Sequence, residues 1–420
     1  MWPKRIVLAN DPERKLQGAR VWRTFDTEAA FVNHPSVAQV SLVQPALVDA
    51  RPRLVAVDLA RALAVFMMVQ GHCLHALLAP QFAQGPVFET WLWIRGLSSV
   101  MFTTLAGYAF AIATSKRWHE HVRLGEAARQ RVGRLLSFFV LGYAMHFPVY
   151  GVRNLATLST TGWRDFLQVD VLQAISVSVL TLELLVIVSR TRRRFVAATL
   201  GLGTLVALAT PLMRLHDWQA TLPLSLAGYL YEGSGSNFPL FPWSGFALLG
   251  AGLGTLTVDW QRSGIEHVAR RLLGVGAGLL GLATAWQLLP AHIFRPSLEP
   301  EDSSDFLFLR LGIALVLLGL LLFATRRTRR LPDFLAVVGR QSLLIYFAHV
   351  VLVYGSIWNP GLRDVVGGKL GPLATFGSII AIETSMVLLA LGWDSFARRA
   401  PHLRGPVKWA CAIALAVPLL

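Results

Sequence analysis

The chain has 420 residues, of which 54% are hydrophobic and only 15% are charged, whereas globular proteins carry about 25% charged residues. This composition excludes an ordinary globular protein and indicates a membrane protein. The net charge of +15 would suit a nucleic-acid partner, but the basic residues alternate between loops instead of forming one surface.

Apolar stretches of about 20 residues, the length that crosses a bilayer core, recur along most of the chain. They predict an all-α fold, a polytopic membrane helix bundle of about 10–11 transmembrane helices. The eleven predicted spans cover residues 54–78, 90–114, 132–150, 169–189, 195–213, 238–258, 272–290, 306–325, 333–355, 373–393 and 406–420. The last stretch is short, and the sixth is interrupted by Pro239 and Pro242.

Lysine and arginine gather in alternate loops, at 116–134, 190–194, 262–271, 326–330 and 398–408, and in the N-terminal tail. The intervening loops contain few basic residues. This alternation follows the positive-inside rule and predicts a cytoplasmic N-terminus. The basic surplus is therefore a topology signal, and no nucleic-acid partner is expected.

Residues 1–53 are polar and lack a signal-peptide pattern, so we expect a cytoplasmic N-terminal segment followed by a transmembrane domain over 54–420. The chain is expected to be a multi-pass protein of a bacterial inner (plasma) membrane, with its function inside the bundle or at its rim. Cys73 and Cys411 lie in predicted helices and indicate no disulfide framework. No cluster with metal-ligand spacing is present, so no metal is expected. The helix glycines are interpreted as packing positions.

The first predicted span, VDLARALAVFMMVQGHCLHALLAP, carries ionisable groups that membrane helices usually exclude. Residues three and four apart share one face of a helix, and Asp58, Arg61, His72 and His75 fall on one such stripe. Arg61 and His72 are about 16 Å apart along the axis, so the stripe reaches from the cytoplasmic rim to the outer half. Asp58 and Arg61 could instead be an ion pair that fixes topology, and His75 could simply lie at the headgroup boundary.

The ninth predicted span repeats this pattern in GRQSLLIYFAHVVLVYGS. Ser342, Tyr346 and His349 share one face, and Arg340 lies near the cytoplasmic rim. A single membrane histidine often only forms a hydrogen bond between helices. Two histidines at matched depth, each with an arginine below, predict instead one pocket that is reached from both sides.

The segments VDLARALAVFMMVQGH, FTTLAGYAFA and GRQSLLIYFAH, in this order, resemble motifs of membrane acyltransferases. The spacing Arg61-x10-His72 is similar to that of the type-3 acyltransferase family. DVLQAISVSVL (170–180) and FPLFPWSGFALLGAGLG (238–254) more closely resemble bacterial relatives of heparan-α-glucosaminide N-acetyltransferase. One departure is Ala62, where the family commonly has glycine after the arginine.

This resemblance implies transfer of an acetyl group from cytoplasmic acetyl-CoA, as donor substrate, to an extracytoplasmic glycan or glycolipid. It implies that His72 is the catalytic histidine and Arg61 its partner, and that His349 is a recurrent family histidine. Asp58 completes the predicted catalytic group. Histidine suits this chemistry because it can act as a general base or carry the acyl group. The expected partners are the acyl-CoA donor, the carbohydrate acceptor and the lipid bilayer; no oligomeric state is predicted.

The phosphates of CoA require cations near the cytoplasmic rim. The candidates are Arg131, Arg134, Arg326, Arg327 and Arg340. Each of these arginines could instead serve only the positive-inside topology.

Groups near the outer helix ends and on the face of His349 are predicted to bind the acceptor. They are His75, Asp170, Arg310, Tyr346 and Ser342, with His146 as a further candidate. Asp170 could instead orient His72 or His349, or only cap its own helix.

The same polar stripe could pass a solute, as in a multi-pass transporter or exporter. Transporters often contain a twofold repeat with paired broken helices, whereas only one proline-broken segment, 238–258, stands out here. A non-catalytic scaffold would leave the aligned arginine and histidine unexplained. We therefore expect an acetyl-CoA-dependent membrane acyltransferase, with a small-solute transporter as the alternative.

Overall fold

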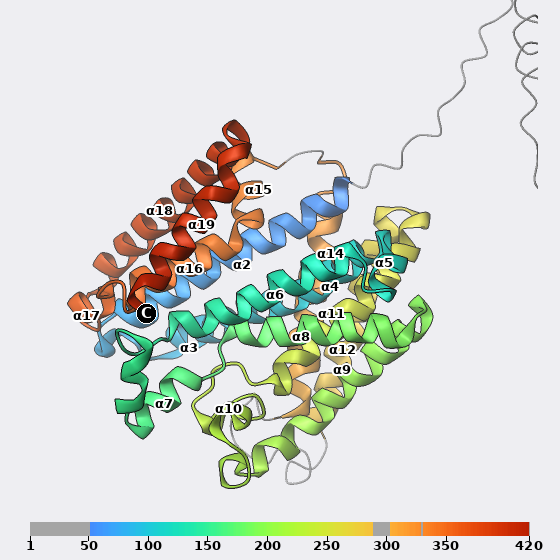
Figure 1. The fold of residues 1–420 in the computed structure, drawn as a ribbon. Helices are drawn as coiled ribbons and strands as arrows, with labels where there is room; N and C mark the ends of the chain where they lie inside the picture. The colour runs from blue at the N-terminus through green and yellow to red at the C-terminus, as the bar shows by residue number, and fades with distance from the viewer. Residues whose placement is uncertain (1–50, 289–302, 329–330, 420) are drawn as a thin grey trace, which may run out of the picture. The chain divides into compact units, whose positions relative to one another are not determined.

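A computed structural model describes residues 51–288, 303–328 and 331–419, so most of the predicted segment 1–53 lies outside the described residues. Residues Ala50–Leu420 form one compact unit. The described residues form helices and loops without a β-strand (Figure 1), which confirms the predicted all-α bundle. The α-helices are α2 (Arg51–Leu77), α3 (Pro86–Arg95), α4 (Leu97–Lys116), α5 (Trp118–Val122), α6 (Glu126–Met145), α7 (Thr160–Leu167), α8 (Val171–Ser189), α9 (Arg192–Leu215), α10 (Leu224–Ala227), α11 (Leu240–Trp260), α12 (Ile265–Gln287), α14 (Ser304–Ala324), α15 (Asp333–Arg340), α16 (Ser342–Tyr354), α17 (Leu362–Val366), α18 (Pro372–Arg399) and α19 (Arg404–Ala416).

Within the described residues, eight helical segments are long and apolar enough to cross a membrane. They are α2, α8, α9, α12, α14, α18, the continuous α3–α4 segment Pro86–Lys116, and Leu240–Ser263, which contains α11. The predicted span 333–355 is divided into α15 and α16, which meet at an angle of 76° and would make a ninth span if counted together.

The predicted spans 132–150 and 406–420 are helical but are not among these eight. Helix α6 has 20 residues, but its first half carries Glu126 and several arginines, which lower its mean hydropathy. Helix α19 has only 13 residues and is about 20 Å long, which is shorter than a bilayer core of about 30 Å. The number of spans supported by length and composition is therefore lower than the predicted 10–11.

Small residues bring α4 and α11 into backbone contact. A Cβ atom on Gly107 would lie 1.9 Å from the carbonyl oxygen of Ala247, and one on Gly250 would lie 2.4 Å from that of Thr104. Neither position has room for a side chain, so these glycines set the helix separation. The interpretation of helix glycines as packing positions is confirmed for these two, as expected where association depends on close contact between helices. It does not hold for helix glycines such as Gly201 and Gly274, where an added Cβ would meet nothing within 4 Å.

Helix α2 lies between two groups of helices (Figure 1). One face of α2 packs through Ala60 and Ala64 into a core shared with α4, α11 and α14. Another face packs through Val65 and Val69 against α15, α16 and α18. The alanine and valine side chains allow close packing on both sides, so Asp58, Arg61 and His72 of the polar stripe are partly buried, whereas His75 is exposed.

Candidate active site

His72 on α2 and His349 on α16 face each other across the contact between these helices. Nδ1 of His72 lies 2.9 Å from Nε2 of His349, and the rings stack with centroids 5.1 Å apart and an interplanar angle of 17°. His349 is fully buried and His72 is partly buried. The two histidines that the sequence placed in one pocket are in direct contact.

The hydrogen bonds of His349 define which nitrogen of His72 is basic. Nδ1 of His349 lies 2.7 Å from the carbonyl oxygen of Ile345, one turn earlier on α16. Because a carbonyl oxygen can only accept, this Nδ1 carries a proton, and Nε2 of the neutral ring has a lone pair. That Nε2 accepts the Nδ1 proton of His72 in a hydrogen bond. The lone pair of the neutral His72 ring is therefore on its own Nε2.

Two further side chains surround His72. The ring of Tyr354 meets the His72 ring edge-on with centroids 5.5 Å apart. Arg95 of α3 lies against Gly71, where an added Cβ would be 2.6 Å from Cδ of Arg95. Gly71 is required for this close approach, and it brings a cation close enough to act electrostatically on His72. Neither Arg95 nor Tyr354 was predicted from the sequence, and the only signal was the glycine directly before His72.

A second polar group lies beside the histidine pair and is centred on Asp170. Its Oδ2 atom is 3.3 Å from Nε2 of His146 and 3.3 Å from the hydroxyl of Tyr346. The Tyr346 ring meets the His349 ring edge-on at 5.9 Å between centroids. Nε2 of Gln168 lies 3.1 Å from Nδ1 of His146. Asp170 therefore orients His146 and Tyr346, whereas the orienting partner of His349 is a backbone carbonyl.

The ends of two neighbouring helices bring His146 and Asp170 together. Helix α6 ends shortly before Pro148, and His146 is its C-cap residue. Asp170 is the N-cap of α8, and its Oδ1 accepts the N–H of Val171 at 2.7 Å. Burial raises the pKa of the Asp170 carboxyl, but the hydrogen bonds from His146 and Val171 outweigh it and bring the pKa below its ordinary value. Asp170 is therefore ionised at neutral pH.

The opposite end of the α2 stripe contains Asp58 and Arg61, both partly buried. The backbone of Asp58 lies against Gly339 of α15, where an added Cβ would be 2.4 Å from the Asp58 carbonyl oxygen. Arg61 and Arg340 both act electrostatically on Asp58. The structure therefore brings the predicted residues Asp58, Arg61 and Arg340 together at one end of α2. Arg61 is about 16 Å and Asp58 about 21 Å along the helix from His72.

The other predicted phosphate-binding arginines are divided among α6, the turn after α14 and the end of α15. Arg134 and Arg327 are exposed, and Nε of Arg326 forms an ion pair with Glu266 at 3.2 Å. Arg340 is 47% exposed and lies 3.6 Å from Asp394. These four guanidinium groups remain accessible to different extents, and their binding role stays a prediction.

Arg131 belongs to a buried polar cluster that was not predicted. Its Nη1 lies 2.6 Å from the hydroxyl of Thr114 and 3.2 Å from Oε2 of Glu183. Nδ1 of His121 lies 2.7 Å from the other carboxylate oxygen of Glu183. The side chains of His121 and Glu183 are each only 2% exposed. Arg131 therefore neutralises a buried carboxylate, which gives it a structural reason to be present.

The remaining predicted acceptor contacts have different surroundings. His75 is exposed near the end of α2, and Ser342 is half-buried at the start of α16. Arg310 is buried, with Nη1 2.5 Å from the carbonyl oxygen of Trp93 and its guanidinium carbon 4.3 Å from the centre of the Trp93 ring. Arg310 thus supports α3, while Asp170 and Tyr346 are the predicted acceptor residues that lie beside the histidine pair.

Gln173 is a further polar residue that the sequence interpretation missed. It lies one turn after Asp170 and is fully buried, and neither polar atom of its side chain has a hydrogen-bond partner among the described residues. Its amide faces Gly142, where an added Cβ would be 2.5 Å from Oε1. Buried amides are ordinarily satisfied, so Gln173 is a candidate to bind a polar group of a substrate.

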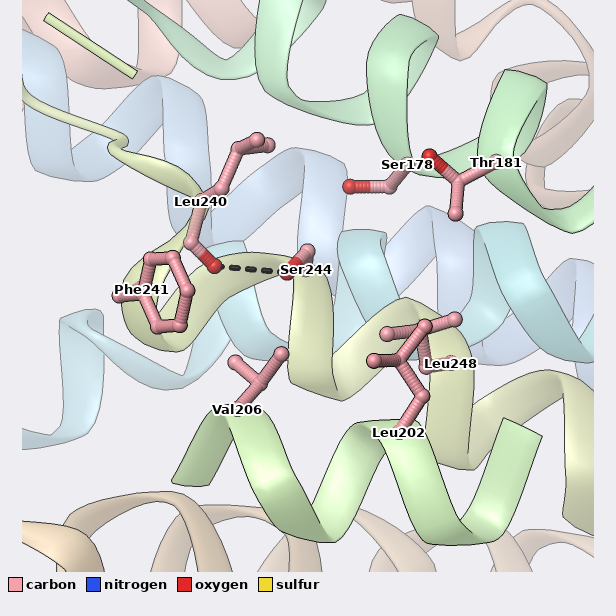
Figure 2. A pocket seen from close by; sticks show the side chains of 8 residues that line it. All are labelled: Ser178, Thr181, Leu202, Val206, Leu240, Phe241, Ser244 and Leu248. Carbon is pink, nitrogen blue, oxygen red and sulfur yellow. Dashed lines mark hydrogen bonds between the residues drawn. The ribbon is translucent and has the colours of Figure 1, made fainter. Parts of the chain in front are cut away.

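A cavity of about 150 Å³ lies between α8, α9 and α11, away from the histidine pair (Figure 2). The hydroxyls of Ser178, Thr181 and Ser244 point to carbonyl oxygens one turn earlier in their own helices, at 2.7, 2.9 and 2.7 Å. Because these hydroxyls are already hydrogen-bonded, the lining of the cavity is effectively apolar. It includes no predicted site residue. No group of three or more His, Cys, Asp or Glu side chains within the described ranges is placed to hold a metal ion.

These features define a multi-pass membrane protein with a histidine-based site inside its helix bundle. The family model described as heparan-alpha-glucosaminide N-acetyltransferase, catalytic, matches residues 53–283, more than half of the chain. The chain belongs to this family, and it is an integral membrane acetyltransferase of this type. Family membership favours an enzyme over the transporter alternative, and the family in general uses acetyl-CoA as acyl donor. No match was found among curated proteins.

The family match includes His72, His146 and Asp170 but ends before α14. His349 and Tyr346, which complete the site, therefore lie outside the matched region. Only the packing of α16 against α2 brings them to His72.

Proposed function

We propose that the protein transfers an acetyl group from cytoplasmic acetyl-CoA to a hydroxyl or amino group of a glycan or glycolipid on the other side of the membrane. The family name supports an aminosugar as acceptor. The alternation of basic loops supports an orientation in which the Asp58 end of α2 is cytoplasmic and His72 lies in the outer half. CoA then remains on the cytoplasmic side while its acetyl group crosses.

The observation that carries this proposal is the lone pair on Nε2 of His72, which follows from the hydrogen bonds of His349. In the proposed first step, this Nε2 attacks the carbonyl carbon of the thioester, the C–S bond breaks, and CoA leaves as its thiolate. The proton on Nδ1 of acetylated His72 is then shared with Nε2 of His349, so the positive charge is spread over two rings. In the second step the acceptor attacks the acetyl carbon, and the C–N bond to His72 breaks.

The cytoplasmic end of α2 is proposed to bind the nucleotide part of CoA. Arg61 and Arg340 flank Asp58 there, and guanidinium groups pair well with phosphates. A donor bound at this end must extend its thioester arm about 16 Å along α2 to reach His72. Because Glu183 already holds Arg131, Arg340 is the stronger candidate of the two for phosphate binding.

The test uses purified protein in liposomes, with acetyl-labelled acetyl-CoA supplied on the side that exposes the basic loops and glucosamine on the other. We expect label on His72 in the wild-type protein. The substitution His72→Ala should remove this label and reduce transfer by about 10²–10⁴-fold, the usual contribution of a catalytic histidine.

The exposed His119 of α5 lies outside the proposed site, so His119→Ala is the matched control and should retain activity. Transfer that persists in the His72→Ala variant, or failure of the wild type to bind acetyl-CoA, would refute the proposal. Solute flux without acetyl-CoA turnover would indicate the transporter alternative.

A further inference from the structure

We propose that His146, held by Asp170, is the general base that takes the proton of the acceptor in the second step of transfer. This inference rests on the proposed acetylation of His72 and gives the two histidines different tasks. His72 carries the acetyl group, and His146 activates the nucleophile that removes it.

The hydrogen bonds of His146 place its lone pair on Nδ1. Its Nε2 faces the ionised Asp170 carboxylate at 3.3 Å, and a carboxylate can only accept, so Nε2 carries the proton. Nδ1 therefore has the lone pair and accepts an N–H of Gln168 at 3.1 Å. An imidazole with one nitrogen bonded to a buried carboxylate and a lone pair on the other is the arrangement of a general base in a catalytic triad.

Gln168 marks the direction from which the acceptor would approach. It lies in the link between α7 and α8 and points a donor N–H at Nδ1 of His146. The O–H or N–H of a sugar can replace this donor with the same geometry. The His146 side chain is 22% exposed and that of Asp170 is 17% exposed, whereas His349 is fully buried. The base is therefore at the accessible edge of the site.

Asp170 also connects His146 to the acetyl-carrying histidine. The Tyr346 hydroxyl donates to the same oxygen of Asp170 that faces His146, and the Tyr346 ring contacts the His349 ring. Asp170 is close enough to act electrostatically on His72. Tyr346 and Asp170 therefore link His146 to the histidine pair by contacts between side chains.

The proton balance requires a base other than the histidine pair in the second step. Acetylation uses the lone pair of His72 Nε2, and the remaining Nδ1 proton is shared with His349, so the pair already carries one positive charge. The acceptor proton passes to Nδ1 of His146 as its oxygen or nitrogen bonds to the acetyl carbon. The C–N bond then breaks and its electron pair returns to His72 Nε2. The His146 imidazolium, stabilised by Asp170, releases its proton to water at the exposed edge.

The experiment compares wild type, His146→Gln and His146→Ala in liposomes with labelled acetyl-CoA and two acceptors. Glucosamine is the acceptor that needs a base, and hydroxylamine is a strong nucleophile that attacks acyl-imidazoles without one. We expect both variants to acetylate His72 and release the first CoA at the wild-type rate. Transfer to glucosamine should fall by about 10²–10⁴-fold, while transfer to hydroxylamine should stay close to wild type.

His146→Gln is the structural control, because its amide N–H can still donate to Asp170 but has no basic nitrogen. Glucosamine transfer restored by His146→Gln would overturn the proposal and show that His146 only holds the helix ends. Equal losses with both acceptors would also overturn it, because they indicate a positioning role. A wild-type protein that transfers acetyl groups without labelling His72 would refute the proposed acetylation of His72, whatever the His146 variants do, and would leave acetyl transfer itself in place.

Discussion

Helix α8 has a histidine–carboxylate pair near each end, and the two pairs differ in burial and in partners. Near its C-terminal end, His121 lies 2.7 Å from Glu183, both side chains are 2% exposed, and Arg131 is 3.2 Å from the same carboxylate. At its N-terminal end, His146 lies 3.3 Å from Asp170, and these side chains are 22% and 17% exposed.

In the proposed mechanism, this difference separates a structural cluster from a reactive one. A buried carboxylate is costly unless it is paired, and Arg131 pairs with Glu183 permanently. Asp170 instead accepts from two neutral side chains, a histidine and a tyrosine, and from the backbone N–H of Val171. The histidine keeps a lone pair on its other nitrogen, and its side chain is partly exposed. The first arrangement fixes helices, whereas the second can accept a proton. Three sets of variants and one pH series test this distinction.

The largest expected effect is the loss of stability caused by Glu183→Ala. This change leaves the guanidinium of Arg131 partly buried without its carboxylate, which typically costs about 3–5 kcal/mol of stability. Unfolding in detergent would measure the loss. The double variant Arg131→Met/Glu183→Leu removes both charges and should recover much of it. A double variant as unstable as Glu183→Ala would show that the ion pair is not the cause.

At the other end, Asp170→Asn should reduce activity more than stability. Asparagine is also a good N-cap, so the start of α8 is preserved and we expect a stability change below about 1 kcal/mol. The neutral amide no longer stabilises a His146 imidazolium, so glucosamine transfer should fall by about 10²-fold or more. Steady-state transfer and thermal unfolding measure the two effects. A large loss of stability with unchanged turnover per folded molecule would reverse the comparison.

A smaller change in stability is expected from a substitution at the contact between α6 and α8, and α6 also offers a control position. A Cβ on Gly142 would lie 2.5 Å from Oε1 of Gln173, whereas one on Gly133 would meet nothing within 4 Å. Gly142→Ala should cost about 1–3 kcal/mol through overpacking. Gly133→Ala should stabilise the protein by about 0.5–1 kcal/mol, because alanine loses less entropy in a helix. Equal effects in thermal unfolding would argue against close packing at Gly142.

The smallest expected effect is the pH dependence of stability that the Asp170 carboxyl causes. The pKa of Asp170 lies below its ordinary value of about 3.9, so the ionised carboxyl favours the folded protein. Its stabilisation is fully present above about pH 4 and is lost as the pH falls through the lower folded-state pKa. The difference in Tm between wild type and Asp170→Asn should therefore shrink as the pH falls below about 4. A difference that stays the same there would show that the Asp170 charge does not contribute to stability.

Much of the fold was predictable because a bilayer imposes long apolar helices that satisfy their own backbone groups. All eleven predicted spans are at least partly helical in the described residues. The bend between α15 and α16 was not predicted, because the sequence 333–355 is continuously apolar enough to read as one helix. The first half of α6 is charged and α19 is short, so neither helix is long and apolar enough to count as a membrane span, although both were predicted as spans.

The candidate site was predictable only in part. His72 and His349 were identified because an imidazole in an apolar helix is costly and therefore conspicuous. Arg95, Tyr354 and Gln168 were missed because each reaches the site from another helix or loop, by a close approach that no local spacing encodes. Arg131 was predicted to bind phosphate, but its contact with Glu183 depends on the packing of α6 against α8.

Hydropathy and helical periodicity are local properties, so the sequence was sufficient to predict a helical membrane protein with histidines at one depth on two distant spans. The packing of the folded helices sets three further features: His72 donates to His349, Nε2 of His72 keeps the lone pair, and Asp170 holds His146. The physical reason is that a ring's tautomer is set by what each nitrogen faces, and those partners come from helices that are adjacent only after folding.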